Sequence, residues 1–133
     1  MGYSDRRPLP GTPVTATITA RANNRLGAVY SALHAFWQSR QSAVSSSGQG
    51  QATTNIVRRD AYSIVMFDSS AEECEANNFD STPQDLLNAV LRYGVGGGTN
   101  YNAALVTVRS VMETHWSTER SVSLLECYSD VVC

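Results

Sequence analysis

The sequence contains no lysine, since all ten of its basic residues are arginines. This absence excludes Schiff-base chemistry, a lysine general base and the phosphate-binding lysine of a P-loop. The chain also has only two histidines, His34 and His115, both within segments of helical spacing, and it has no G-x-S-x-G sequence. A hydrolase needs a positioned base, so the sequence predicts that the protein is not an enzyme of this kind.

The chain is also poor in cysteine. Cys74, Cys127 and Cys133 lack the paired spacing of a metal site, and the sequence contains neither a secretory apolar segment nor an Asn-x-Ser/Thr glycosylation site. These features favour a reducing compartment. We therefore expect a cytoplasmic or other intracellular location.

Neither membranes nor nucleic acids are expected as partners. No apolar run approaches the roughly 18 residues needed to span a bilayer. Ten basic and twelve acidic residues give a net charge of −2, which provides no broad positive field to attract a polyanion.

The length and composition suit a single domain. A chain of 133 residues with 42% hydrophobic residues has enough material for one modest core. Residues 1–13 contain three prolines and no apolar periodicity, which predicts a loose, disordered tail. Residues 14–133 would then form the domain.

The first half of this domain predicts a strand followed by a helix. Residues 14–20 alternate β-branched residues, as an edge strand does. Apolar residues at helical spacing predict a helix over residues 25–40, with Asn23 or Asn24 as its N-cap. The small polar residues 42–55 predict a flexible connection.

The second half alternates in the same way. Residues 61–67 form an apolar run typical of a strand covered on both faces, and an exposed return strand is expected next. Thr82, Pro83 and Asp85 are typical of a helix start, and this helix is expected to end at Gly94. A further helix is expected from Tyr101 to about Trp116, and a last strand over residues 122–125.

This order of strands and amphipathic helices predicts an α/β fold. We expect three layers, with a mostly parallel sheet flanked by helices. In such folds, ligands bind beyond the carboxyl ends of the strands.

A glycine-rich segment, "GVGGGTN", lies between the last two expected helices and carries the main functional signal. A phosphate site needs a strand before such a loop, but a helix is expected here, and Thr99 stands where G-x-G-x-x-G requires its last glycine. A nucleotide-binding α/β enzyme that uses residues 94–99 remains an alternative. In another interpretation, the glycines let two helices meet closely and Thr99 caps the second helix.

Three segments, "NRLGAVYSALHAFW", "DAYSIVMFDSSAE" and "GVGGGTNYNAALVTVRSVM", resemble the von Willebrand factor A domain in sequence and order. The likeness covers about residues 24–120. It implies an incomplete Rossmann-like fold and a module that binds protein ligands through a metal-ion-dependent adhesion site. Thr99 is the residue that matches the family's metal-binding threonine. Gly96, Gly97, Gly98 and Asn100 would form the supporting loop.

The metal motif of that family is only partly present. The family's first strand ends in Asp-x-Ser-x-Ser, whereas this chain has "TATITARANNRL" and no carboxylate between Asp5 and Asp60. Asp130 is a weak candidate for a second acidic group. The resemblance implies Mg²⁺, but without its main charge partner the ion is expected to bind weakly or not at all.

One other segment of the chain approximates the missing metal motif. Asp68, Ser70 and Glu72 approximate an Asp-x-Ser-x-Glu motif, but they follow a different strand from the family's motif, which favours a solvated turn.

The family's later strands are also missing from the chain. The third functional alternative is therefore a truncated, non-functional fragment that buries too little apolar surface to fold.

Overall fold

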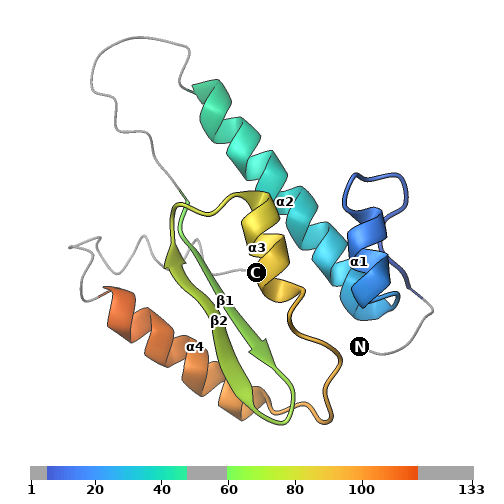
Figure 1. Cartoon of the computed structure of the whole chain (residues 1–133). Helices are drawn as coiled ribbons and strands as arrows, with labels where there is room; N and C mark the ends of the chain where they lie inside the picture. The colour runs from blue at the N-terminus through green and yellow to red at the C-terminus, as the bar shows by residue number, and fades with distance from the viewer. Residues whose placement is uncertain (1–5, 48–59, 117–133) are drawn as a thin grey trace, which may run out of the picture.

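The structure is a computed structural model that describes residues 6–47 and 60–116. Within this part, four helices accompany one two-stranded sheet. The elements in chain order are α1 (Thr15–Arg21), α2 (Arg25–Ser47), β1 (Tyr62–Phe67), β2 (Ala71–Asn78), α3 (Pro83–Val90) and α4 (Tyr101–Trp116). Figure 1 shows α4 on one side of the sheet and α3 with α2 on the other. The fold is therefore α/β, as predicted; the strand expected over residues 122–125 lies outside the described residues.

The sheet is antiparallel, so the prediction of a mostly parallel sheet is wrong for the described strands. Phe67 pairs with Ala71 across a short turn, and Val65 pairs with Glu73. A connection this short can only join antiparallel strands, because a parallel pair needs a crossover of a dozen or more residues. The return strand after residue 67 is confirmed. No residue of β1 is fully buried, which differs from the expected coverage on both faces.

Residues 14–20, predicted as a strand, belong to helix α1 and its N-cap. Val14, Ile18 and Ala22 are spaced by four residues, and all three are buried in the core. The alternating pattern therefore also contains a helical stripe. Packing of this stripe against α2 overrides the β propensity of the segment.

The described part of the expected tail, residues 6–13, contacts the helices. Pro8 is buried, and the Leu9 N–H donates a hydrogen bond of 3.2 Å to Ser31 Oγ on α2. The Thr15 hydroxyl donates to the Leu9 carbonyl at 2.6 Å. These bonds hold the chain in place as it enters α1.

Helix α2 begins where the sequence predicts. The side-chain Oδ1 of Asn24 accepts hydrogen bonds from the N–H groups of Leu26 and Gly27, at 3.0 and 3.3 Å, as an N-cap does. The helix continues to Ser47, past its predicted end at residue 40. Residues 42–47 of the expected flexible connection are therefore helical, and residues 48–55 lie outside the described part of the chain.

Helix α3 has the predicted N-terminal capping box. Thr82 Oγ1 accepts from the Asp85 N–H at 3.2 Å, and the Asp85 carboxylate accepts from the Thr82 N–H at 3.1 Å. Pro83 occupies the first helical turn, where its missing N–H costs nothing. The helix ends at Val90 rather than at the predicted Gly94.

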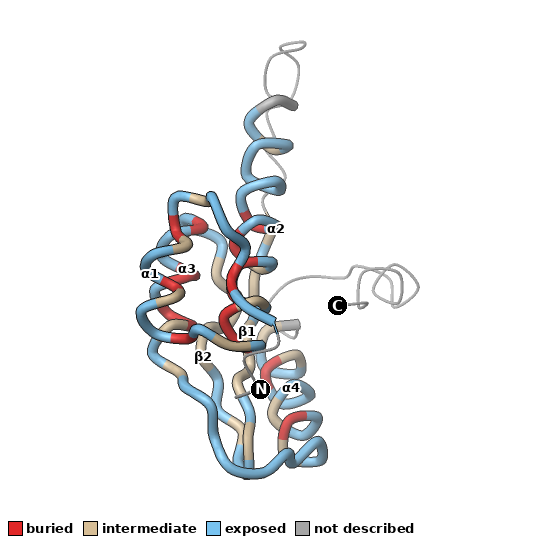
Figure 2. Tube along the Cα trace, turned by 90° about the vertical axis from the view of Figure 1, so that its right-hand side faces the viewer, coloured by how far each residue is buried: buried red, intermediate tan, exposed pale blue. Residues whose placement is uncertain are grey.

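The largest fully buried side chains belong to one core cluster. Ile18, Tyr30, Leu86, Leu87 and Val90 come from α1, α2 and α3. Figure 2 shows the buried positions concentrated on these helices, with a smaller group on α4. Burial raises the pKa of Tyr30 to about 12, and its hydroxyl donates to the Tyr93 carbonyl at 3.0 Å.

Helix α4 is confirmed at its predicted bounds. It contacts both strands and buries Ala104 and Val111. None of the helices within the described residues is long and apolar enough to cross a membrane.

The Thr82 cap provides a test of the α3 N-terminus. Thr82→Ala should lower the free energy of unfolding by about 1 kcal/mol, because the Asp85 N–H loses its acceptor. Thr82→Ser keeps the hydroxyl oxygen and should stay close to the parent. Urea denaturation followed by circular dichroism measures both variants. Equal losses in the two variants would show that the cap oxygen is not the stabilising group.

Candidate functional site

The turn between β1 and β2, residues 68–70, is organised by one carboxylate. Asp68 Oδ1 accepts hydrogen bonds from the Ser70 N–H at 2.9 Å and the Ser70 hydroxyl at 3.2 Å. The Asp68 N–H donates to the Ser70 carbonyl at 2.8 Å. The bonds from Ser70 lower the pKa of Asp68, because they stabilise its charged form.

The glycine loop, residues 94–100, is hydrogen-bonded to this turn. The Gly98 N–H donates to Ser69 Oγ at 3.0 Å, and the Asn100 N–H donates to the Asp68 carbonyl at 2.7 Å. The Asn100 side-chain amide donates to the Ser69 carbonyl at 3.2 Å. These three bonds fix the loop at the carboxyl end of β1. We call residues 68–70 and 94–100 together the loop cluster.

Gly96 is required by a close approach between the two halves of the loop cluster. A Cβ atom at Gly96 would lie 2.6 Å from both Cβ and Cγ of Asp68, inside van der Waals contact. At Gly97 and Gly98 the nearest atom is Ser69 Oγ, at 3.3 and 3.2 Å. The glycine run therefore allows the loop to pack against the Asp68 side chain.

Thr99 and Asn100 have different roles at the start of α4. Asn100 Oδ1 accepts from the Ala103 N–H at 3.0 Å, so Asn100 caps the helix in place of Thr99. Thr99 itself is exposed. Thr99 lies in the loop at the carboxyl end of β1, directly before Asn100, whose N–H donates to the Asp68 carbonyl.

A small pocket of about 100 Å³ opens beside the loop cluster. Its lining residues are Met66, Phe67, Asp68, Ser70, Glu72, Tyr93 and Gly94. The structure therefore brings together the three residues of the Asp-x-Ser-x-Glu segment, which the sequence favoured only as a solvated turn. Its two carboxylates and the absence of a basic residue in this lining make the pocket acidic.

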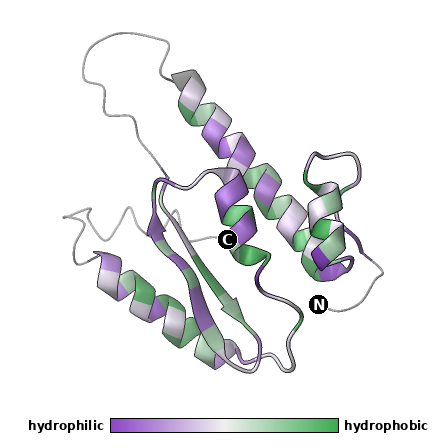
Figure 3. Ribbon diagram, viewed as in Figure 1, coloured by the Kyte–Doolittle hydropathy of each residue, from purple (hydrophilic) through white to green (hydrophobic). Residues whose placement is uncertain are grey.

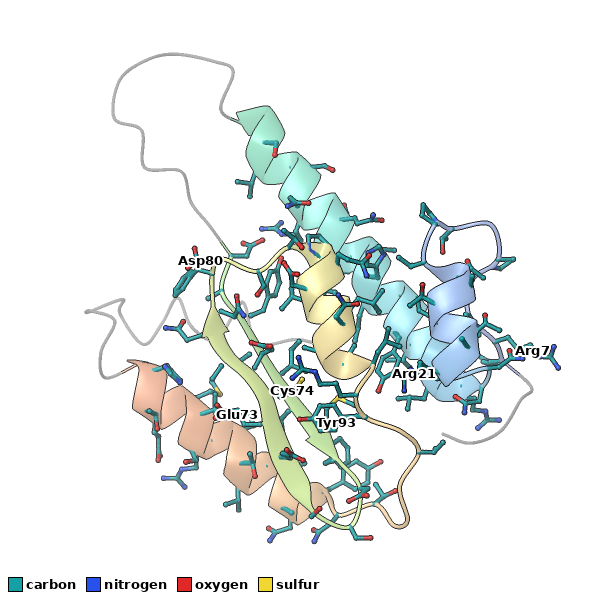
Figure 4. The ribbon with its side chains drawn as sticks, in the orientation of Figure 1. Arg7, Arg21, Glu73, Cys74, Asp80 and Tyr93 are labelled. Atoms are coloured by element: carbon teal, nitrogen blue, oxygen red, sulfur yellow. The ribbon has the colours of Figure 1, made fainter. Side chains whose placement is uncertain are left out.

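Tyr93 is the pocket residue that sequence reasoning missed. It lies beside Cys74 of β2 (Figure 4), and burial raises its pKa, with further contributions from Cys74 and Glu72. No motif marked Tyr93, because its place depends on the turn after α3. The only sign of its role in the sequence is that Tyr93 directly precedes Gly94, the first residue of the glycine loop.

Of Thr99 and Asp130, the two metal-ligand candidates from the family resemblance, the structure describes only Thr99. Thr99 is not among the residues that line the acidic pocket, and Asp130 lies outside the described chain. Helix α1 stands in place of the expected first strand and carries no carboxylate. Within residues 6–47 and 60–116, no group of three or more His, Cys, Asp or Glu side chains could hold a metal ion.

A larger pocket of about 280 Å³ lies between α2, β1 and the start of α3. Arg40 and Asp60 within it form a bidentate ion pair, at 2.7 and 2.9 Å. The rings of Trp37 and Tyr62 meet edge to face, with centroids 6.3 Å apart. Because its basic group already pairs with a carboxylate, this pocket presents less uncompensated charge than the loop cluster.

The fold and the site together define an α/β protein with an acidic pocket at the turn end of an antiparallel hairpin. Comparisons of the chain with protein-family models, curated proteins and solved structures found no match. The resemblance to the von Willebrand factor A domain therefore stays a prediction from the sequence.

Two glycines offer a matched test of the loop geometry. Gly96→Ala should destabilise the protein by about 1–3 kcal/mol, because the added methyl group overlaps Asp68. Gly94→Ala adds the same group into open space and should change stability by less than about 0.5 kcal/mol. Urea denaturation separates the two. An equal effect at both positions would contradict the close approach at Gly96.

The Asp68 carboxyl offers a pH-dependent test. Because its pKa is lowered in the folded state, its bonds to Ser70 stabilise the turn above the unfolded pKa and are lost as the pH falls through the folded value. Ser70→Ala removes the hydroxyl donor and should raise the pKa of Asp68 toward its ordinary value. NMR titration of the Asp68 side chain measures this shift. An unchanged pKa would show that the hydroxyl bond is not formed.

Proposed function

We propose that the chain is a protein-binding module of the von Willebrand factor A type, and not an enzyme, with the loop cluster as its ligand-binding surface. The observation that supports this proposal most directly is that three hydrogen bonds hold the glycine loop at the carboxyl end of β1. Loops that a rigid scaffold holds in place are where proteins most often carry their binding residues. The proposal thus takes the glycine segment, which resembles part of that family's metal site, as part of the surface on which a ligand would bind.

The chemistry of the surface favours a basic side chain from the partner. Asp68 and Glu72 supply two carboxylates to one pocket. Phe67, Val95 and Tyr101 near the cluster expose 44, 49 and 68% of their surface. A partner that presents an arginine flanked by apolar groups would satisfy both features, because charge-assisted bonds orient the ligand and aromatic contacts supply binding energy.

Metal binding in this proposal is weak or absent. Two carboxylates and the Ser70 hydroxyl are hard oxygen donors of the kind that Mg²⁺ prefers. However, Asp68 Oδ1 already accepts two hydrogen bonds from Ser70. A basic side chain would also compete with the ion for the same oxygens.

The nucleotide-binding alternative is less well supported. Helix α3, and not a strand, precedes the glycine loop in the chain. The N–H groups of Gly98 and Asn100 already donate to Ser69 and Asp68, so they are engaged before any phosphate arrives. The carboxylates of the pocket would also repel a phosphate.

An NMR titration with small probes tests the proposal. The peptide N-acetyl-Trp-Arg-Leu-amide should shift the amide signals of residues 68–72 and 94–101, with a dissociation constant on the order of millimolar. The same peptide with Glu in place of Arg should not shift them. Resolved, dispersed amide signals in the free protein would also exclude the interpretation of an unfolded fragment.

Charge variants and other ligands complete this test. Asp68→Asn with Glu72→Gln should abolish the shifts, whereas Glu73→Gln changes a β2 carboxylate outside the pocket and should preserve them. Magnesium chloride should produce only weak shifts at the same residues. Shifts caused by ATP, with none from the arginine peptide, would contradict the proposal and favour the enzyme alternative.

A further inference from the structure

The two edges of the sheet differ in charge. β1 reads "YSIVMF" and carries no charged residue, whereas β2 contains Glu72, Glu73 and Glu75. Figure 3 shows the contrast, with β1 mainly hydrophobic and β2 mainly hydrophilic. Within residues 6–47 and 60–116, β1 pairs only with β2, so none of these residues forms a strand beside its second edge. Native proteins normally protect such an edge with charge, proline or a bulge, and the two irregularities in the pairing of this hairpin place their extra residues in β2 rather than in β1.

The backbone of β1 directs hydrogen-bonding groups to this second edge. The bond from the Asp68 N–H to the Ser70 carbonyl, together with the pairing of Phe67 with Ala71, fixes the alternation over Val65–Phe67. Toward Tyr62 the pairing has two register shifts, and at each of them the extra residue lies in β2, so the alternation of β1 continues to Ser63. In an antiparallel ladder, every second residue bonds to the neighbouring strand. Met66 therefore faces β2 with its N–H and C=O, and those of Val65 and Phe67 point away from β2.

The side chains around this edge are also incompletely covered. Val65 of β1 is only partly buried, although helices lie on both sides of the sheet. On α4, Tyr101, Leu105 and Val108 follow one helical stripe beside the buried line, and they expose 68, 68 and 37% of their surface. The Phe67 and Tyr101 rings lie 5.6 Å apart, so the first residue of this stripe contacts the end of β1.

We propose that this edge is a dimer interface, at which the β1 strands of two copies pair antiparallel. The sheet would then have four strands, in the order β2, β1, β1 and β2. The N–H and C=O groups of Val65 point away from β2, so the two-fold axis passes beside this residue. Val65 then pairs with Val65 of the partner subunit. Ser63 then faces Phe67 of the partner subunit. The apolar stripe of α4 extends over the added strand.

A second copy fits this edge because the edge is self-complementary. An uncharged strand can lie beside its own copy without repulsion, and a two-fold axis lets each copy supply the same groups to the other. The outer strands of the resulting sheet carry the glutamates of β2, which repel further copies. The assembly therefore stops at a dimer and does not grow into a fibre.

Sedimentation of the full chain over a concentration series gives the first test. The expected result is a reversible shift from 14.4 kDa to twice this mass as the concentration rises. A chain that stays monomeric over the whole series would overturn the proposal. A monomer is also the result expected if another segment of the same chain covers the edge of β1, so that arrangement would overturn the proposal as well.

Proline at two adjacent positions tests which edge is used. Val65→Pro removes an N–H that points away from β2, so the hairpin should remain folded while the dimer is lost. Met66→Pro removes an N–H that faces β2 and should disrupt the hairpin itself. Circular dichroism and sedimentation are measured on both variants. A Val65→Pro variant that unfolds like Met66→Pro, or that still dimerises, would overturn the proposal.

A charge pair tests the register independently of folding. Ser63→Lys with Phe67→Lys places like charges opposite each other across the interface and should give a monomer. Ser63→Lys with Phe67→Glu changes the same two positions but places opposite charges there, and it should remain dimeric. Misfolding caused by the altered side chains would affect both variants alike. Equal behaviour of the two variants would overturn the assigned register.

Discussion

The packing of α3 against α2 is the constraint on which the rest of the structure depends. Leu86, Leu87 and Val90 of α3 are fully buried, and they share one cluster with Tyr30 of α2. The Tyr30 hydroxyl also holds the Tyr93 carbonyl, so the chain leaves α3 in a fixed direction. One face of β1 and β2 packs against the same cluster, which brings the carboxyl end of β1 within reach of the glycine loop.

This placement changes the role of the glycines. In a phosphate site, glycines leave backbone N–H groups open to an anion. Here the N–H groups of Gly98 and Asn100 bind the β1–β2 turn, and Gly96 makes room for the Asp68 carboxylate. The result is a surface with negative charge and engaged backbone donors. This chemistry supports the proposed basic protein ligand rather than the nucleotide alternative.

The small sheet links the site to the proposed dimer. A two-stranded sheet is marginal by itself, and helices on both of its sides supply much of its apolar contact. The loop cluster lies at the turn end of the hairpin, whereas the dimer would use the long edge of β1. The two surfaces meet at Phe67, which lines the acidic pocket and contacts Tyr101 of α4.

The sequence by itself determined the features that arise from neighbouring residues. These include an asparagine cap at residue 23 or 24, which the structure shows to be Asn24, the capping box of Thr82 and Asp85, the β1 strand with its return strand, and helix α4. Only tertiary packing made residues 14–20 a helix, because their pattern carries both a period of two and a spacing of four. The pocket likewise joins Asp68 and Glu72 to Tyr93, more than twenty positions away. Such distant pairs leave no periodic signal, because only the burial of α3 sets the direction in which the chain returns.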